Sequence, residues 1–538
     1  MPSPCWCLRS RKPPRGVSTP ARGQRRAEPE RRIRFGSGLP CEWALATKPL
    51  PSAMALSWAR RLIRRPACLK WVALSTAPEE DCRQGAGRHE TPRKRWMKEK
   101  KPRQGFSLPG LECSWEERLS SVATPLWRLA YEEQLKVKAE SQKKVLQTLA
   151  SRLREHGTDK LEITQRPDGL CCPLHPVVPS PIVNGYRNKS TFSVNRGPDG
   201  NPKTVGNYVG TGRAKNIVCV RANRLQNVPE KHKQVAQCYE EFLQQSPLDP
   251  CLLFHEGGHW RELTVRTNSS GHTMAIITFH PQDLNQEELC TQKTLLKEFF
   301  TCGPGAVCAL TSLYFQESTM TRSSHQQSPY QLLYGEPYIF EEVLGLKFRI
   351  SPDAFFQINT AGAEVLYQTV GKLSQADKNT ILLDVCCGTG AIGLSLAHQA
   401  SKVVGVEMVE QAVEDARWNA AINGISNCEF HSGKAEVVLP QFLMSREDDQ
   451  PLVVVVNPSR AGLHYRVVRA IRNCEATRTL IYVSCKPDGE AMRNFLEFCC
   501  PPDSRKKLVG EPFVPLLAVP VDMFPHTMHC ELVMVFTR

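Results

Sequence analysis

From residue 381 to the C-terminus, short apolar runs alternate with stretches that have the apolar spacing of helices. This alternation predicts an α/β fold with a mostly parallel, doubly wound sheet. Ligands of such sheets bind at the carboxyl ends of the strands, so we expect functional residues where each run stops. The expected strands lie at 381–387, 402–408, 428–433, 452–458, 479–485, 513–523 and 530–538.

The rest of the chain differs in composition from this region. Residues 1–105 are rich in Pro, Arg, Ser and Gly without sustained periodicity, so we expect them to be mostly disordered. Residues 106–164 are predicted to form a helical connector, because 125–156 has helically spaced apolar residues. Residues 165–345 change to short β-like runs with turns and two helical stretches, which predicts an α+β domain. Residues 346–538 are then expected to form a C-terminal domain around the predicted sheet.

The positive charge of the chain is concentrated near its N-terminus. The net charge is +15, and residues 1–105 alone hold 25 Lys and Arg against 8 Asp and Glu. The stretch 54–75 has no acidic residue and mixes Arg pairs with Leu, Ile and Trp. This composition is typical of a mitochondrial transit peptide and predicts a location in the mitochondrial matrix. A basic tail that binds RNA or an import factor is the alternative.

A glycine-rich turn follows the first expected strand of the C-terminal domain. Gly388, Gly390 and Gly393 have the spacing G-x-G-x-x-G, which permits a tight turn and a close approach of the backbone to a ligand. Asp384 lies at the end of that strand. Glu407 lies at the end of the next one, where a carboxylate suits a ribose diol. These residues are predicted to bind a cofactor, and by themselves they fit NAD as well as S-adenosylmethionine (AdoMet).

Two reactive side chains stand at the ends of later runs. Cys485 ends the run at 479–485, and Glu531 directly precedes LVMVF. A thiolate that adds to carbon 6 of uracil makes carbon 5 nucleophilic enough to accept a methyl group. A general base must then remove the proton from carbon 5. On a uracil substrate Cys485 would be the candidate nucleophile and Glu531 the candidate proton acceptor, and such a pair favours AdoMet over NAD. By position alone, a buried structural cysteine and a strand-edge surface carboxylate are the alternatives.

Three strings in one order carry a family resemblance, namely DVCCGTGAIG (384–393), YVSCKP (482–487) and FPHTMHCELV (524–533). With them, the chain closely resembles the tRNA/rRNA uracil-5-methyltransferase family, from the region of Trp115 to the C-terminus. The resemblance implies a Rossmann-like methyltransferase domain that holds AdoMet, preceded by an RNA-binding domain. It also implies that the product is 5-methyluridine, in the tRNA T-loop, in rRNA or in both.

The resemblance extends to further cofactor and substrate contacts. The family's F-x-Q-x-N segment is FFQIN here, which places the cofactor-binding glutamine at Gln357. The loop after the fourth strand is usually D-P-P-R and is NPSR here. Asn457 thus replaces an aspartate, and it can hydrogen-bond cofactor or uracil without supplying a negative charge. Arg460 is a candidate contact to an RNA phosphate, with a plain surface charge as the alternative. Lys486 stands where the family has Asn.

An RNA-facing string is expected in the α+β domain. GYRNKSTFSV (185–194) is nearly verbatim the family's Y-R-N-K string. Arg187 and Lys189 are predicted to contact RNA phosphates, while Tyr186 and Phe192 are expected to offer stacking surfaces for bases.

Two other functions stay open. The departures at Asn457 and Lys486 would fit a non-catalytic RNA-binding or folding factor. A 5-methylcytidine methyltransferase would usually carry a second cysteine in the loop after the fourth strand, and NPSR has none.

The 22 cysteines include no C-x-x-C pair, so we expect no metal or iron–sulfur cluster. The sequence implies no membrane insertion and no obligate protein partner.

Overall fold

The computed structural model describes residues 113–538, apart from 157–165, 211–216, 252–256, 320–328 and 447–449. These residues belong to one compact unit, Lys100–Arg538. The stretch 54–75, on which the transit-peptide prediction rests, lies outside the described residues. Within the described part, no helix is both long enough and apolar enough to cross a membrane.

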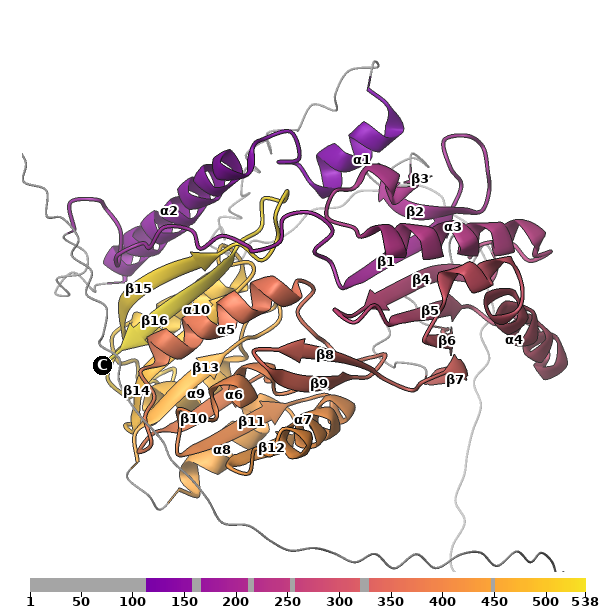
Figure 1. Ribbon diagram of the computed structural model, residues 1–538. Helices are drawn as coiled ribbons and strands as arrows, with labels where there is room; N and C mark the ends of the chain where they lie inside the picture. Colours follow the sequence, from indigo (N-terminus) through magenta and orange to yellow (C-terminus); the bar gives the residue numbers. More distant parts are fainter. Residues whose placement is uncertain (1–112, 157–165, 211–216, 252–256, 320–328, 447–449) are drawn as a thin grey trace, which may run out of the picture. The chain divides into compact units, whose positions relative to one another are not determined.

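The C-terminal sheet has the strand order β12-β11-β10-β13-β14-β16-β15 (Figure 1). The first five strands in this order are parallel, and β16 and β15 extend the sheet as an antiparallel pair. The predicted doubly wound α/β fold is therefore confirmed. Its strands are β10 (Ile381–Val385), β11 (Lys402–Glu407), β12 (Cys428–Ser432), β13 (Leu452–Val456), β14 (Thr477–Ser484), β15 (Val514–Val521) and β16 (Glu531–Thr537).

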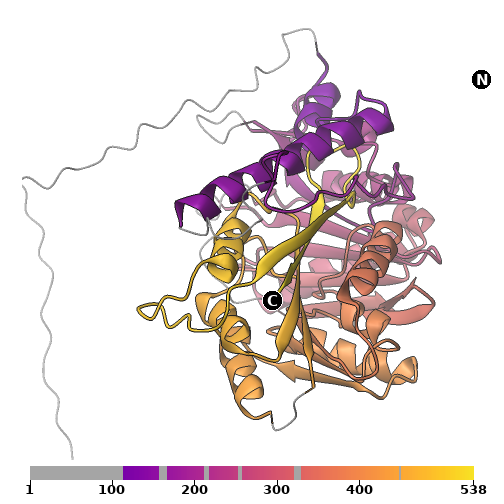
Figure 2. The ribbon, with the colours of Figure 1, turned by 90° about the vertical axis from the view of Figure 1, so that its left-hand side faces the viewer.

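Helices cover both faces of this sheet, as Figure 2 shows. Successive side chains of a strand point to opposite faces, so Leu382 and Leu383 belong to different apolar clusters. One cluster joins the strands to α5 (Thr360–Ser374), α6 (Ala391–Leu396) and α7 (Glu410–Ile422). The other joins them to α2 (Tyr131–Glu155), α8 (Ala435–Met444), α9 (Tyr465–Asn473) and α10 (Glu490–Cys499).

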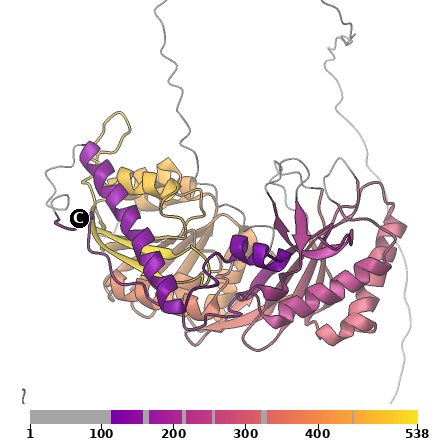
Figure 3. The same cartoon turned by 90° about the horizontal axis from the view of Figure 1, so that it is seen from above.

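The helix expected within 125–156 is α2, and it packs on the C-terminal sheet. Its buried residues between Val145 and Leu153 join the same apolar cluster as strands of that sheet. Figures 2 and 3 show α2 beside the yellow strands β15 and β16, which are the last two strands of the chain. The start of the described chain thus packs against its end.

Another sheet, which we call the first sheet, lies earlier in the chain and has the order β3-β2-β1-β4-β5-β6-β7. Neighbouring strands are antiparallel except β5 and β6, and the turn GPDGNP (197–202) joins β1 to β2. The strands are β1 (Lys189–Asn195), β2 (Thr204–Val209), β3 (Val218–Val220), β4 (Trp260–Thr267), β5 (Thr273–Phe279), β6 (Ser312–Glu317) and β7 (Tyr330–Gly335). Its helices are α1 (Trp115–Ala123), α3 (Glu230–Gln245), α4 (Gln286–Thr301) and the short 3-10 turns η2 (Ala222–Arg224) and η3 (Pro304–Cys308).

A hairpin and a short segment connect the two sheets along the chain. The hairpin consists of β8 (Ile339–Val343) and β9 (Leu346–Ile350). The segment 351–359 then leads to α5, which begins after Asn359. The Asn359 side chain accepts a hydrogen bond from the Gly362 N–H at 2.9 Å, so it caps the helix. This segment also carries Gln357 to the C-terminal sheet.

Candidate active site

The residues predicted from the sequence meet at one edge of the C-terminal sheet. Because β10, β11, β13 and β14 are parallel, their carboxyl ends lie together. The glycine turn follows β10, Glu407 ends β11, Asn457 follows β13 and Cys485 follows β14. β16 is antiparallel to β14, so it begins at this same edge with Glu531.

Cys485 and Glu531 lie across from each other at the ends of neighbouring strands. Ser484 and Leu532 are register partners in the β14–β16 pair, and Cys485 and Glu531 come next. The Cys485 side chain is half-buried, and Glu531 is 3% exposed. The Arg460 guanidinium, from the loop after β13, lies near enough to act on both Cys485 and Glu531 through its charge. Arg460 is thus placed beside this pair, whereas its contact to an RNA phosphate stays a prediction.

Burial sets the acidity of this pair. It raises the pKa of the Cys485 thiol, the charge of Glu531 adds to that effect, and Arg460 opposes it. Burial also raises the pKa of Glu531, to about 8, again against the influence of Arg460. Arg460 is therefore the charge that favours the ionised form of both groups. A thiolate and a carboxylate in this arrangement can act as nucleophile and proton acceptor.

The glycine turn leaves its backbone open to a ligand. Gly388 and Gly390 have φ angles of +55° and +78°, a conformation that favours glycine. A Cβ at Gly388 would meet only the Phe355 carbonyl oxygen, at 3.8 Å. The Glu407 carboxylate accepts a hydrogen bond from the Gly388 N–H at 3.0 Å. The turn and the end of β11 are thereby held together, with open space at Gly388.

Asp384 is placed differently from the sequence expectation. Its side chain is 0% exposed and accepts a hydrogen bond from the Gly393 N–H at 2.9 Å. Burial raises the pKa of this carboxyl to about 7. The alternation along β10 points Asp384 to the sheet face that α6 covers, so it supports the glycine turn from below. A fully buried carboxylate has no surface for direct contact with a cofactor in this structure.

The segment before α5 brings Gln357 to this edge, together with an aromatic residue that the sequence analysis missed. Gln357 is buried, and its carbonyl accepts a hydrogen bond from Asn188 Nδ2 at 2.7 Å. Phe355 is 64% exposed beside Gly388. Met408 and Val409, directly after Glu407, are also exposed apolar residues. Single exposed apolar residues such as these leave no periodic pattern in a sequence. Only their position next to the predicted cofactor-binding residues could have marked them as part of the site.

The expectation of stacking surfaces at Tyr186 and Phe192 is wrong for this structure. Phe192 is 1% exposed and belongs to the core of the first sheet, because β1 turns Ser190, Phe192 and Val194 inward. Tyr186 is buried, and its hydroxyl donates a hydrogen bond to the Pro525 carbonyl at 3.2 Å. A base can stack only on an exposed ring face, and neither ring presents one.

Arg187 and Lys189 are half-buried and lie with a third cation. Lys189 is the register partner of Arg266, which is 3% exposed. Arg187 Nε donates a hydrogen bond to the Lys189 carbonyl at 3.1 Å, and Arg266 donates one to the Ala354 carbonyl. Burial and the neighbouring cations lower the pKa of Lys189 to about 8. We call Arg187, Lys189 and Arg266 the basic cluster.

The basic cluster has no paired acid among the described residues. No Asp or Glu oxygen in the described part of the chain lies within 4.0 Å of a charged nitrogen of these three side chains. Arg266 Nε is buried without a hydrogen-bond partner in that same part. Asp353 acts on Lys189 and Arg266 through its charge from beyond that distance. Two cross-strand cations repel each other, so the cluster still offers a place for a further anion.

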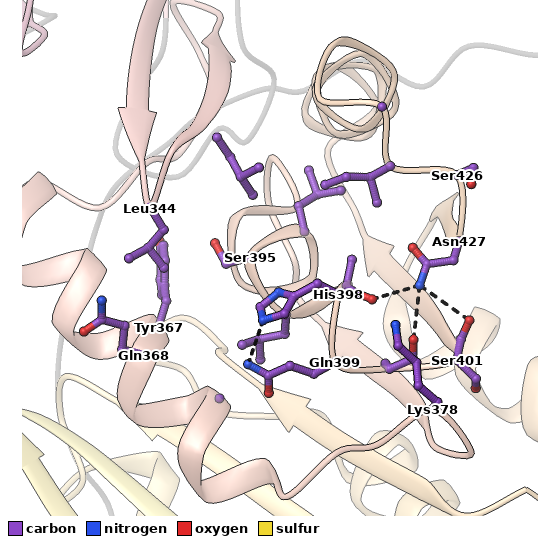
Figure 4. Close-up of a pocket in the computed structure, with 18 of the residues that line it drawn as sticks. Leu344, Tyr367, Gln368, Lys378, Ser395, His398, Gln399, Ser401, Ser426 and Asn427 are labelled. Carbon is purple, nitrogen blue, oxygen red and sulfur yellow. Dashed lines mark hydrogen bonds between the residues drawn. The ribbon is translucent and has the colours of Figure 1, made fainter. Parts of the chain in front are cut away.

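A cavity of about 860 Å³ lies away from these residues. Its lining comes from α5, α6 and the segments that precede β11 and β12, including Tyr367, His398 and Asn427 (Figure 4). It therefore opens at the amino ends of β11 and β12. None of the predicted site residues is among the residues that line it. Ligands of parallel sheets bind at the opposite edge, so this cavity is not the candidate active site.

Comparison with known proteins assigns the chain to a family. Human tRNA (uracil-5-)-methyltransferase homolog B is 68% identical over 432 residues, which cover 80% of this chain and 86% of that protein. The chain belongs to the tRNA (uracil-5-)-methyltransferase family. A second human member of this family, homolog A, is 44% identical over 429 residues, covering 78% of this chain and 68% of that protein.

The fold agrees with this assignment to the tRNA (uracil-5-)-methyltransferase family. A family model described as a methyltransferase domain matches residues 376–491. The solved tRNA (uracil-54, C5)-methyltransferase of Pyrococcus abyssi, in complex with S-adenosyl-L-homocysteine, has a TM-score of 0.54 and 23% identity. That alignment covers 77% of this chain and 86% of the archaeal one. Among the described residues, no group of three or more His, Cys, Asp or Glu is placed to hold a metal ion.

Proposed function

We propose that the chain methylates carbon 5 of uridine in RNA, with AdoMet as methyl donor and a covalent adduct through Cys485. One observation carries the proposal: a half-buried thiol and a buried carboxylate face each other at adjacent strand ends, beside Arg460. They lie at the edge of the sheet that also holds the glycine turn. The names of the relatives supply the substrate class, because these relatives are called uracil-5-methyltransferases of tRNA.

The residues around the glycine turn fit AdoMet. The backbone at Gly388 is open, and the exposed Phe355 and Met408 offer apolar surface for an adenine ring. Glu407 accepts hydrogen bonds from the backbone N–H groups of Gly388, Met408 and Val409. A carboxylate has about four lone-pair sites, so one is left for a ribose hydroxyl. When bound, AdoMet supplies an electrophilic methyl group.

Gln357 and Asn457 stay predicted contacts to this cofactor. Both lie at the correct edge of the sheet, since the segment of Gln357 abuts the glycine turn and Asn457 follows β13. The Asn457 backbone N–H donates to the Val385 carbonyl at 3.2 Å, which ties the two strand ends together. We propose that Asp384 supports the turn through Gly393 and does not contact the cofactor directly.

Cys485 and Glu531 act in succession. The Cys485 thiolate adds to carbon 6 of uracil, and the electron pair of the 5,6 double bond moves onto the ring carbonyl as an enolate. Carbon 5 of that enolate would then take the methyl group that bound AdoMet supplies, with the electrons of the sulfur–methyl bond staying on sulfur. Glu531 then takes the proton from carbon 5. The released electrons restore the double bond and expel Cys485 as a thiolate.

The basic cluster is the proposed contact to an RNA phosphate. Burying a cation without a carboxylate at ion-pair distance costs on the order of several kcal/mol, and a bound phosphate would lower that cost. Asn188, between Arg187 and Lys189, donates to the Gln357 carbonyl at 2.7 Å. The cluster therefore adjoins the segment that reaches the glycine turn. A phosphate bound there would lie near the nucleotide that enters the active site.

Lys189→Met is expected to weaken RNA binding by roughly tenfold and to lower the salt dependence of binding by about one phosphate contact. Lys189→Arg keeps the charge and should keep most of the affinity. Lys293→Met, which removes a cation paired with Glu317 on the same sheet, is the matched control. Filter binding at several salt concentrations measures both quantities. Unchanged affinity and salt slope for Lys189→Met would contradict the role of the basic cluster.

The RNA target is a uridine of the tRNA T-loop, of mitochondrial rRNA, or of both. Mass spectrometry of RNA nucleosides from cells that lack the protein, mapped by transcript, tests this. We expect loss of 5-methyluridine at defined positions. Loss of 5-methylcytidine instead would favour the cytosine methyltransferase. A binding or folding factor would leave every modified nucleoside in place.

We further propose that the protein acts in the mitochondrial matrix, from the acid-free basic stretch 54–75. A reporter fused to residues 54–110 is expected to enter mitochondria, and N-terminal sequencing of the mature protein should find 54–75 removed. Changing the Arg residues of 54–75 to Gln in the fusion should abolish import. Retention of the unchanged fusion in the cytosol or nucleus would refute the location.

A further inference from the structure

The segment between β15 and β16 leads directly into Glu531, and it is bound from outside at four successive carbonyl groups. The donors come from four separate places in the chain, three of which precede the first strand. These hydrogen bonds run from Asn359 Nδ2 to Met523 O at 3.1 Å, from Lys138 Nζ to Phe524 O at 2.9 Å, from Tyr186 Oη to Pro525 O at 3.2 Å, and from the Leu126 N–H to His526 O at 3.0 Å.

The strongest of these attachments is an ion pair with α2. Lys138 Nζ lies 2.5 Å from Asp522 Oδ1, and both side chains are 0% exposed. Asp522 Oδ1 also accepts the Phe524 N–H at 3.1 Å, and Oδ2 accepts the Tyr131 hydroxyl at 3.1 Å. A buried ion pair is weak support for stability by itself, because both charges lose their water. Both hydrogen bonds of Lys138, to Asp522 and to the Phe524 carbonyl, go to this short segment, so the pair fixes the position of the segment relative to α2.

A second attachment from α2 holds a residue in an uncommon conformation. His526 has a φ angle of +68°, which is rare for a residue with a side chain. Gln134 accepts the His526 N–H at 2.7 Å and lies 3.2 Å from its Nδ1. On the other side of the ring, Nε2 lies 2.8 Å from Asn184 Oδ1. Such a conformation persists only where the surroundings hold it.

The anchored segment is coupled directly to Glu531. Val521 is the register partner of Glu531, and Asp522 is the next residue after Val521. The Cys530 thiol also donates a hydrogen bond to the Val521 carbonyl at 3.2 Å. A shift of Asp522 would therefore move the strand end that carries the carboxylate relative to Cys485.

We propose that Lys138 is a positioning residue for Glu531, acting through Asp522. This inference rests on the proposed function, because it assumes that Glu531 removes the carbon-5 proton. Glu531 acts only after the methyl group has moved, so its displacement slows elimination and leaves addition and methyl transfer nearly intact. Helix α2, which precedes the C-terminal domain in the sequence, thereby helps to position an active-site residue.

The test is the charge-neutral double variant Lys138→Met with Asp522→Asn, which removes the pair without leaving one charge buried alone. A displacement of about 1 Å can slow a catalytic step about 100-fold. We expect elimination to slow by at least about tenfold and single-turnover methyl transfer by less than about threefold. Methylated RNA then accumulates as a denaturant-resistant adduct on the protein. Quenched single-turnover reactions with labelled AdoMet measure both rates.

The control variant is Arg221→Met with Glu240→Gln. It removes an ion pair of the same 2.5 Å length between the buried Glu240 of α3 and Arg221, which directly precedes η2. It should lose a similar amount of thermal stability without accumulating adduct. Tyr131→Phe removes the hydroxyl that donates to Asp522, and it should slow elimination by about threefold. This variant tests the positioning of Glu531 if the double variant does not fold.

Two failures are distinguishable in this experiment. RNA that contains 5-fluorouridine cannot lose fluorine as a proton, so it should trap the wild-type protein covalently. No trapped complex with the wild type would overturn the proposed function. A trapped wild-type complex, together with normal elimination in a folded double variant or in Tyr131→Phe, would overturn the positioning role of Lys138.

Discussion

Cys485→Ser is expected to abolish methylation while AdoMet binding is retained. A serine hydroxyl is far less acidic than a cysteine thiol. It therefore does not ionise to a nucleophile that can add to carbon 6. The loss should be at least about 10⁴-fold, as expected when the nucleophile of a coupled set is removed. Incorporation of label from AdoMet into RNA measures turnover, and calorimetry measures binding of the cofactor.

Cys474→Ser is the matched control for this variant. Cys474 is a free, half-buried cysteine directly after α9, away from the carboxyl edge of the sheet. It should keep full activity. With 5-fluorouridine RNA, the wild type and Cys474→Ser should form a covalent complex that Cys485→Ser does not form. Near-normal turnover by Cys485→Ser would remove the cysteine from the mechanism.

Glu531→Gln is expected to stop the reaction after methyl transfer. Glutamine has nearly the shape of glutamate but is not an effective base, so the proton on carbon 5 stays. Methylated RNA should remain attached to Cys485 and migrate as a slow, denaturant-resistant band that carries label from AdoMet. Overall turnover should fall by about 10²- to 10⁴-fold. The double variant Cys485→Ser with Glu531→Gln should lose the band.

The pH dependence gives an independent check on Glu531. Its pKa is raised to about 8 by burial, and a base must be ionised to accept a proton. Elimination by the wild type should therefore speed up as the pH rises from about 6 towards 8 and level off above that. Arg460→Met removes the charge that opposes this shift, so the rise of the elimination rate should move to higher pH.

If Glu531→Gln releases product at a normal rate, Glu531 is not the base, and His526 or His529 becomes the next candidate for it.

Local patterns determined most of the catalytic half of this protein. Apolar runs separated by helical stretches are sufficient to predict a parallel sheet, because buried strands and covering helices impose different spacings. The geometry of parallel strands then brings all carboxyl ends to one edge, which explains why Glu407, Asn457 and Cys485 meet there. The order of three short strings indicated the family, which the 68% identity to the human relative then established.

Burial and distant contacts were decided only by the tertiary structure. Charge and aromatic character do not reveal which face of a strand is covered, so Asp384 and Phe192 looked available while the packing encloses both. Lys138 and Asp522 are 384 positions apart, and neither lies in a pattern that predicts a partner. Their pairing exists because α2 packs against the last strands of the sheet. Sequence spacing reports local geometry alone, whereas the position of Glu531 depends on elements that meet only when the chain has folded.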